Sequence, residues 1–450
     1  MEGTHSASAS ARQCCVAAIL GAGLAACGAS DTPPPAGGGP VVQGGYTITV
    51  RAGVTDYGSG RRGLALLAAV RDEDGAGPSA EWDAELLGSA GIVTAGAITY
   101  HAPGPGSYVA WTWPKLAVNT TEQLQLRIGP TPLDLAAVPF TAAPPATSLG
   151  IPQPRLALDG RTVQWPAVAG AAAYRCMISG QGGMAERLGT TPSCDVAALA
   201  PGSYVVQVQA LSVNLAALGA NTARSPALPS RFDVAEGRLG ILVPDAGGTP
   251  LQLVAAAGAL RFGGVAYIAV WTSITAPDGT PTGAAWSTGV RLIGGSAMDS
   301  ATLMPYPAAA PRALLHGISY ALRATPGDYL LIARSDAEEL SVPVHLGAPA
   351  QLAEPTGVTA AGEPTGGGAV AWNTVAGATS YLVRAYDLDG FEVARGWAAA
   401  PSLGFASGTF TSGDRYDVYV LATDADMIGG AAPLQVAAAE TTYPTAFTAP

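Results

Sequence analysis

Lysine is almost absent from this chain: Lys115 is the only one among 450 residues. Charged residues make up 12% of the chain, about half the usual share, and the formal net charge is −11. Nucleic acids and anionic membrane surfaces are bound by clusters of positive charge. The shortage of basic residues therefore excludes nucleic acid as a partner.

Residues that carry chemistry are also scarce. The histidines (His5, His101, His316 and His345) show no metal-ligand spacing such as His-x-x-x-His. A lone lysine excludes a P-loop, and neither a Gly-x-Ser-x-Gly elbow nor a Ser-x-x-Lys pair occurs. We therefore expect a protein that is not an enzyme and uses no cofactor. An active site assembled between domains is the alternative.

Apolar residues and turn formers are abundant instead. The chain is 48% hydrophobic and contains 58 glycines and 36 prolines without a collagen-like period. This composition favours many short strands over long helices, whereas a disordered chain would be less apolar and more charged. The length allows about three or four domains, so we predict a multidomain all-β protein.

The N-terminus has the features of a secretion signal. Arg12 precedes an uncharged stretch from Cys14 to Ala26, which is too short to span a bilayer but suits the apolar part of a signal peptide. The stretch ends in Leu24-Ala25-Ala26-Cys27, which resembles the lipobox of bacterial lipoproteins. The resemblance implies cleavage before Cys27 and acylation of that residue. A plain signal peptide with a chance cysteine is the alternative.

We thus predict a signal peptide over residues 1–26, lipidation at Cys27 and a location outside the cytoplasm on a membrane, at the cell surface or on the periplasmic face. Residues 27–45 are rich in proline and glycine and show no apolar period. Such a segment is typical of a flexible tether.

Two segments of the chain match each other. "VQWPAVAGAAAYRCMI" starts at Val163 and "VAWNTVAGATSYLVRA" at Val370, with Trp, Val, Gly and Tyr at the same spacing. Downstream, "YVVQVQA" at Tyr204 and "YDVYVLA" at Tyr416 alternate apolar and polar residues, as half-buried strands do.

This pattern resembles the fibronectin type III domain, with its strand-B Trp, its strand-C Tyr and a strand-F Tyr after a Pro-Gly turn. The resemblance covers residues 150–235 and 352–447. It implies two β-sandwiches in which the strand-F tyrosine forms a corner, its hydroxyl bonding to backbone a few residues upstream.

The remaining segments form a second pair. "VRDEDGAGPSAEW" and "ITAPDGTPTGAAW" both place Asp-Gly shortly before Trp, and Asp-Gly between apolar alternations marks a hairpin. Aligning "AITYHAPGPGSYVAW" with "GISYALRATPGDYLLI" puts Ile98 over Ile318 and Tyr108 over Tyr329, so the offset between copies grows from 204 residues at the tryptophans to 220 and then 221. We predict Ig-like sandwiches at 46–147 and 238–349, the second with a sixteen-residue insertion.

The complete prediction is a tandem array of four Ig-like or fibronectin type III-like β-sandwiches after a signal peptide and a tether. The insertion includes "MDSATLMPYPAAAPR" and is interpreted as a surface loop. A functional connecting segment is the alternative, because binding residues often lie in such segments.

Two cysteines lie within the first fibronectin-like segment. Alternation places Cys176 on the same face as Tyr174, and the sister segment has apolar residues, Val383 and Phe405, at the positions matched to Cys176 and Cys194. Both cysteines are therefore expected to be buried. Outside the cytoplasm they form a disulfide if the geometry allows, and two free thiols are the alternative.

Two further patterns are candidate ligand sites. "DEDG" (Asp72, Asp74) and "DLDG" (Asp387, Asp389) resemble the opening of calcium loops, but no further acidic ligand follows at the required spacing, so hairpin turns are favoured and no metal is predicted. Exposed aromatic residues could stack on sugars; the candidates are Trp113, Trp397 and Tyr306. Burial in cores is the favoured alternative.

The sequence therefore predicts a non-catalytic, lipid-anchored protein of the cell envelope, acting as a structural or adhesive spacer or as a protein-binding module. Its partners would be the membrane, through the lipid on Cys27, and an unknown envelope protein or polysaccharide. A surface protein that binds carbohydrate or an envelope polymer is the alternative.

Overall fold

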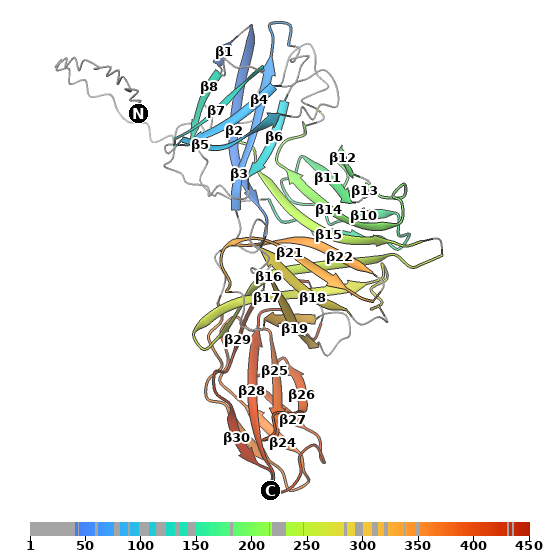
Figure 1. Cartoon of the computed structure of the whole chain (residues 1–450), viewed down its shortest axis with the longest axis vertical. Coiled ribbons are helices and arrows are strands. Elements are labelled where there is room, and N and C mark those ends of the chain that lie inside the picture. Colours follow the sequence, from blue (N-terminus) through green and yellow to red (C-terminus); the bar gives the residue numbers. More distant parts are fainter. Residues whose placement is uncertain are drawn as a thin grey trace, which may run out of the picture. The chain divides into compact units, whose positions relative to one another are not determined.

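The computed structural model describes residues 41–43, 45–58, 62–75, 82–88, 91–98, 108–113, 123–130, 136–141, 149–180, 183–215, 217, 231–245, 247–282, 286–292, 300–307, 314–318, 323–336, 338–347, 351–429, 432–433 and 436–450. Its elements are β-strands (Figure 1), which confirms the predicted all-β class. Cys27 and the predicted signal peptide lie outside the described residues. Within the described part, no helix is long and apolar enough to cross a bilayer.

Strands β1 to β8 form what we call the first region. Hydrogen bonds arrange them in two four-stranded sheets, β1-β2-β3-β6 and β5-β4-β7-β8. The strands are β1 (Val41–Gln43), β2 (Tyr46–Asp56), β3 (Arg62–Arg71), β4 (Trp82–Gly88), β5 (Gly91–Ile98), β6 (Tyr108–Trp113), β7 (Gln123–Pro130) and β8 (Ala136–Thr141).

The second region contains the first fibronectin-like segment. Its sheets are β9-β10-β13 and β12-β11-β14-β15, and its core includes Trp165, Tyr174 and Tyr204. The strands are β9 (Arg155–Leu156), β10 (Thr162–Gln164), β11 (Ala173–Gly180), β12 (Gly183–Gly189), β13 (Ser193–Asp195), β14 (Gly202–Leu211) and β15 (Val234–Val243).

In the third region one continuous ladder follows the order β16-β17-β20-β19-β18-β21-β22. Its core includes Ile268, Tyr329 and Leu331. The strands are β16 (Leu251–Phe262), β17 (Val265–Thr275), β18 (Ser287–Leu292), β19 (Ser300–Pro307), β20 (Leu314–Ile318), β21 (Gly327–Arg334) and β22 (Glu339–Leu346).

The fourth region contains the second fibronectin-like segment. One sheet is β23-β24-β27, and in the other β25 lies between β26 and β28, with β29 and β30 both paired to β28. The strands are β23 (Thr359–Gly362), β24 (Gly368–Ala371), β25 (Ser380–Tyr386), β26 (Glu392–Ala398), β27 (Ser402–Phe405), β28 (Arg415–Thr423), β29 (Val436–Glu440) and β30 (Thr445–Thr448).

The tyrosine corners expected from the fibronectin resemblance are present in both segments. The Tyr204 hydroxyl donates to the carbonyl of Ala200 at 2.9 Å, and the Tyr416 hydroxyl accepts the N–H of Thr411 at 2.8 Å. Each hydroxyl thus pins the turn that leads into its strand while the ring enters the core.

The alignment of the first and third regions was wrong in their second halves. β7 and β21 begin at residues 123 and 327 and end at 130 and 334, a constant separation of 204 residues. β4 pairs with both β5 and β7, as β18 pairs with both β19 and β21. Strand β6 pairs with β3 as β20 pairs with β17, so the counterpart of β6 is β20, not β21.

The predicted sixteen-residue insertion therefore does not exist. The Pro-Gly-x-Tyr motif of the sequence ends at the first residue of β6 in one copy and lies at the start of β21 in the other. These strands occupy different places in the sheets, so matching their tyrosines displaced the alignment. The segment expected to form a surface loop contains β19, which pairs with β18 and β20. Its counterpart in the first region is β5.

Candidate functional site

Strand β15 connects three regions through its backbone. It pairs along its whole length with β14, which runs beside it in Figure 1. At its start, Val234 and Ala235 pair in parallel with the end of β2, and near its end Gly240 to Leu242 pair with β16. The domain limits predicted at residues 235 and 238 fall inside this unbroken strand.

The sequence of β15 explains how it serves two cores. Side chains alternate between the faces of a strand, and Ala235, Leu239 and Ile241 belong to the core of the second region. Leu242, from the opposite face, belongs to the core of the third region. Because one strand contributes to both cores, no linker separates these two regions.

The opposite face of β15 also carries Glu236 and Arg238. Glu236 is only 4% exposed, and its carboxylate accepts the Nε2–H of Gln209 at 2.8 Å and the Nε–H of Arg238 at 2.6 Å. A buried carboxylate is tolerated only when it is paired and hydrogen-bonded in this way. Gln209 is the residue directly opposite Glu236 on β14.

A second buried polar pair lies on the adjoining strands of the third region. Asp328 and His345 are opposite each other on β21 and β22, with His345 Nδ1 2.7 Å from Asp328 Oδ1. Burial lowers the pKa of His345, against the opposing effect of its hydrogen bond to Asp328. A neutral imidazole facing a carboxylate donates from Nδ1, which leaves Nε2 as an unprotonated acceptor.

Glu236, Arg238 and His345 line a cavity of about 80 Å³. Its lining comes from all four regions and includes Tyr57, Arg155, Glu236, Arg238, His345 and Pro433. Pockets that bind small molecules usually measure about 300–1,000 Å³, so this space suits a few water molecules. His345 Nε2 is covered and has no hydrogen-bond partner among the described residues. The cavity marks a junction between the regions.

Two further contacts, which we call the first and second joints, repeat the same design. A Cβ built on Gly53 would lie 1.7 Å from the carbonyl oxygen of Phe232, and one on Gly258 would lie 1.4 Å from that of Val436. At each joint a strand of the Ig-like region, β2 or β16, pairs in parallel with a strand of the fibronectin-like region, β15 or β29. Glycine allows this close backbone approach.

Each joint also buries an apolar core. The first joint core contains Ala65, Leu67, Ala69, Leu211, Val213, Leu215, Phe232 and Val234. The second joint core contains Ala256, Leu260, Ala269, Trp271, Leu382, Leu421, Ala425, Met427, Val436 and Ala438. Burial of this kind favours a fixed contact over two freely moving domains.

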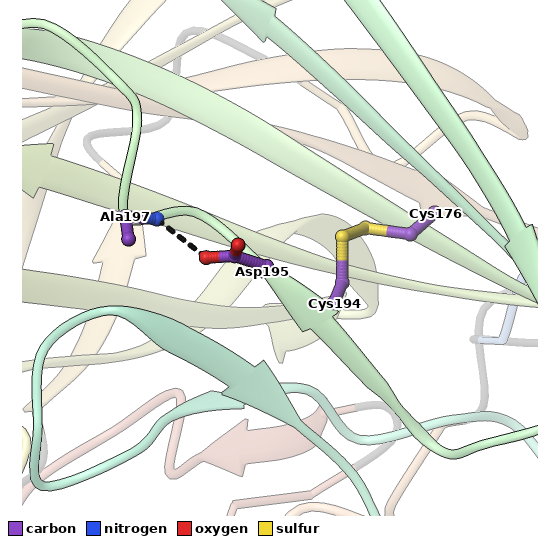
Figure 2. The surroundings of a disulfide bond; sticks show 4 residues. All are labelled: Cys176, Cys194, Asp195 and Ala197. Carbon is purple, nitrogen blue, oxygen red and sulfur yellow. Dashed lines mark hydrogen bonds between the residues drawn. A yellow bond between two sulfur atoms is a disulfide. The ribbon is translucent and has the colours of Figure 1, made fainter.

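Cys176 and Cys194 form a disulfide that joins β11 to β13 (Figure 2), with their Cα atoms 6.3 Å apart. Beside it, the Asp195 carboxylate accepts the N–H of Ala197 at 2.8 Å. One sequence match needs correction. Cys194 lies opposite Val163, and in the fourth region Leu403 lies opposite Val370, so Leu403 rather than Phe405 is the counterpart of Cys194.

The two acidic motifs form turns. One carboxylate oxygen of Asp72 accepts the N–H of Asp74 at 3.0 Å, and one of Asp387 accepts those of Asp389 and Phe391 at 3.0 and 2.8 Å. These bonds satisfy the backbone of a tight turn. Within the described residues, no group of three or more His, Cys, Asp or Glu side chains could hold a metal ion.

The aromatic candidates for sugar binding lie on strands of three different regions. Trp397, on β26, is half-buried and packs against the second joint core. Trp113 lies on β6 and Tyr306 on β19, but their side chains lie outside the described part of the structure. The structure therefore assigns Trp397 to packing.

Sequence reasoning missed the junction residues. Part of the junction can be seen in the sequence, since Glu236 and Arg238 interrupt the apolar strand "VAEGRLGILV" and His345 interrupts "ELSVPVHL". A charged or titratable residue inside an apolar strand indicates a buried partner. The identity of that partner depends on the register of strands far apart in the chain, which cannot be read from the sequence.

Comparisons with known proteins identify no family. No protein-family model matches the chain, and no curated protein matches it. Among solved structures, the FN1–FN3 domains of chicken CNTN1 are 11% identical, with a TM-score of 0.19, over 68% of this chain and 99% of that one.

Two bacterial alpha-2-macroglobulins also align. The protein from E. coli, in its native conformation, is 12% identical with a TM-score of 0.16 over 93% of this chain. The Salmonella protein reacted with methylamine is 13% identical with a TM-score of 0.17 over 91% of this chain. This chain spans 30% of each macroglobulin. With TM-scores this low, the description of the fold rests on the strand pairing alone.

Proposed function

We propose that this protein is a non-catalytic, lipid-anchored spacer of the bacterial cell envelope that presents its distal regions to an envelope protein or polysaccharide. The observation that carries the proposal is strand β15. Because β15 is hydrogen-bonded to β2, β14 and β16, the regions it joins move as one body. A spacer needs such stiffness to hold a binding surface away from its anchor.

The two joints support the same role. Each combines a parallel ladder, a glycine at the closest backbone approach and a buried apolar core. Repetition of a unit of about 204 residues lengthens such an array without adding a flexible linker. A carbohydrate-binding role has no comparable support, because Trp397 packs against the second joint core.

The anchor rests on the sequence. Leu24-Ala25-Ala26-Cys27 fits the lipobox, and the tether that follows gives the folded regions reach. Acyl chains contribute about 0.8 kcal/mol per buried methylene, so more than one chain on Cys27 gives stable attachment.

Fractionation and protease shaving of intact cells test the anchor, with the native protein compared to Cys27→Ser. We expect the native protein in the membrane fraction and cleaved by external protease, and the variant released from the membrane. Native protein that stays protected until the envelope is opened would place it in an internal compartment. A variant that remains membrane-bound would contradict lipidation at Cys27.

An insertion tests the stiffness. Gly-Gly-Ser-Gly placed between Gly237 and Arg238 interrupts β15, and the same insertion after Gly390 lengthens an exposed turn as a control. We expect the first insertion to broaden the distribution of conformations in small-angle scattering, and the second to leave it unchanged. Equal scattering from all three proteins would argue against β15 as the stiffening element.

A further inference from the structure

His345 lies where three regions of the chain meet. Its ring is 4.6 Å from the ring of Tyr57, which follows β2 of the first region. Its Nδ1 bonds to Asp328 in the third region, and it lines the same cavity as Glu236 and Arg238 of β15. A change in the charge of this ring therefore acts on all three regions.

The environment of His345 suits only the neutral ring. The residue is 6% exposed, and its covered Nε2 has no hydrogen-bond partner in the part of the chain that the structure describes. Protonation would create a donor and a positive charge at an atom without an acceptor. An unsatisfied buried donor costs about 1–3 kcal/mol, and more when it is charged.

The charged groups around His345 do not reverse this preference. Asp328 on β21 and Glu236 on β15 favour the cation, whereas Arg238 on β15 disfavours it. Arg155 on β9 and the phenol of Tyr57 also line the cavity. Burial is the largest effect and holds the pKa of His345 below its ordinary value.

We propose that His345 is an acid-sensitive latch: its neutral ring holds the contact between the first and third regions, and protonation at Nε2 opens it. In an opened junction the ring is hydrated and has an ordinary pKa of about 6.5. The closed junction is then fully stable above that pH. As pH falls from there toward the lower pKa of the closed form, the ratio of closed to open junctions drops by up to about tenfold per pH unit.

Hydrogen–deuterium exchange of the full chain at pH 7.5 and pH 5.0, corrected for intrinsic exchange rates, tests the latch. We expect peptides covering residues 46–58 and 339–346 to lose protection at pH 5.0. In His345→Asn the amide nitrogen can still donate to Asp328, but the residue does not titrate, so the acid-induced loss should disappear. His101→Asn is the control and should behave as the native protein.

The titration of His345 by NMR in the native protein gives a result that does not depend on a variant that folds. A pKa below 6.5 supports the latch. A pKa at or above 6.5 would overturn it, because the closed junction would then bind the proton better than the open one. An acid-induced loss of protection that persists in His345→Asn would overturn it as well.

Discussion

The second and fourth regions begin alike and end differently. In both, a tryptophan packs near a strand-C tyrosine, with ring centroids 5.4 Å apart for Trp165 and Tyr174 and 5.1 Å for Trp372 and Tyr381. The last strand of the second region is the unbroken β15. In the fourth region the same edge is divided into β29 and β30, with the exposed Tyr443 between them.

The buried glutamates on these last strands are matched as well. Glu236 lies opposite Gln209 and Glu440 lies opposite Leu421. Glu236 is neutralised by Arg238 on its own strand, whereas Glu440 pairs with Arg384 on β25. The two copies thus keep a buried acid but change its partner. Each last strand contributes to a joint core, through Val234 on β15 and Val436 on β29, and β15 also contributes Leu242 to the core of the third region.

The largest effect is expected at the joints. Gly53→Ala and Gly258→Ala place a methyl group inside contact distance of a carbonyl oxygen, so the backbones must separate, at a cost of about 3 kcal/mol or more. Chemical denaturation measures the loss of unfolding free energy, with the fluorescence of the buried Trp271 reporting on the second joint. Gly404→Ala, which meets no atom within 4 Å, should be near neutral. Wild-type stability in both joint variants would contradict the shared design.

Removal of the disulfide should lower the stability of one fibronectin-like region and not of the other. The bridge joins cysteines with a sequence separation of 18, which corresponds to about 3 kcal/mol in the loop-entropy description. We expect a reductant to lower the calorimetric transition of the second region and to leave that of the fourth unchanged. Transplanting the fourth region's residues, as Cys176→Val with Cys194→Leu, should abolish the response. A reductant effect that survives the transplant would exclude this disulfide as its cause.

The tyrosine corners should contribute equally. Tyr204→Phe and Tyr416→Phe each remove one hydroxyl hydrogen bond and should each lower the free energy of unfolding by about 1 kcal/mol. Urea denaturation compares the unfolding free energies of the two variants. Tyr443→Phe is the control, because Tyr443 is 83% exposed. A loss confined to one corner would show that the two turns are not equivalent.

The smallest effect on stability is expected at the residue that follows β14 in the second region and β28 in the fourth. Ser212 accepts the N–H of Asp233 in the second region, and Asp424 accepts that of Ala437 in the fourth. Burial raises the pKa of Asp424, although the bond from Ala437 opposes this. The ionised carboxylate therefore destabilises the fold above that pKa, and the penalty fades as pH falls toward the unfolded value of about 3.9.

Asp424→Asn keeps the acceptor and removes the charge. We expect it to stabilise the protein at pH 7 by less than about 1 kcal/mol, and by less still at pH 4. Urea denaturation at both pH values measures the difference. A stabilisation independent of pH, or a loss of stability at pH 7, would contradict the assignment.

Local patterns in the sequence predicted the elements well. The all-β class, the tyrosine corners and the Asp-Gly turns follow from residues close together in the chain. The alignment of Tyr108 with Tyr329 failed because a turn motif describes a local conformation and not a position in a sheet. Strand pairing, which places β6 beside β3 and β21 beside β18, is decided by contacts far apart in sequence.

The junction was beyond local patterns for the same reason. Gln252, for example, is buried, and its side-chain oxygen accepts the N–H of Leu156, 96 residues earlier. His345 meets Tyr57 across an even longer separation. The sequence marks such residues as unusual in their strands but does not name their partners.

Strand β15 also determines how the chain would carry tension. A pull on Val243 along the strand loads its ladder with β14 in shear, so many of the bonds between Gly202 and Leu211 and their partners must yield together instead of opening one after another. The load passes directly from the sheet of one region to that of the next through a continuous backbone. With no slack segment between them, these two regions resist stretching as a single element.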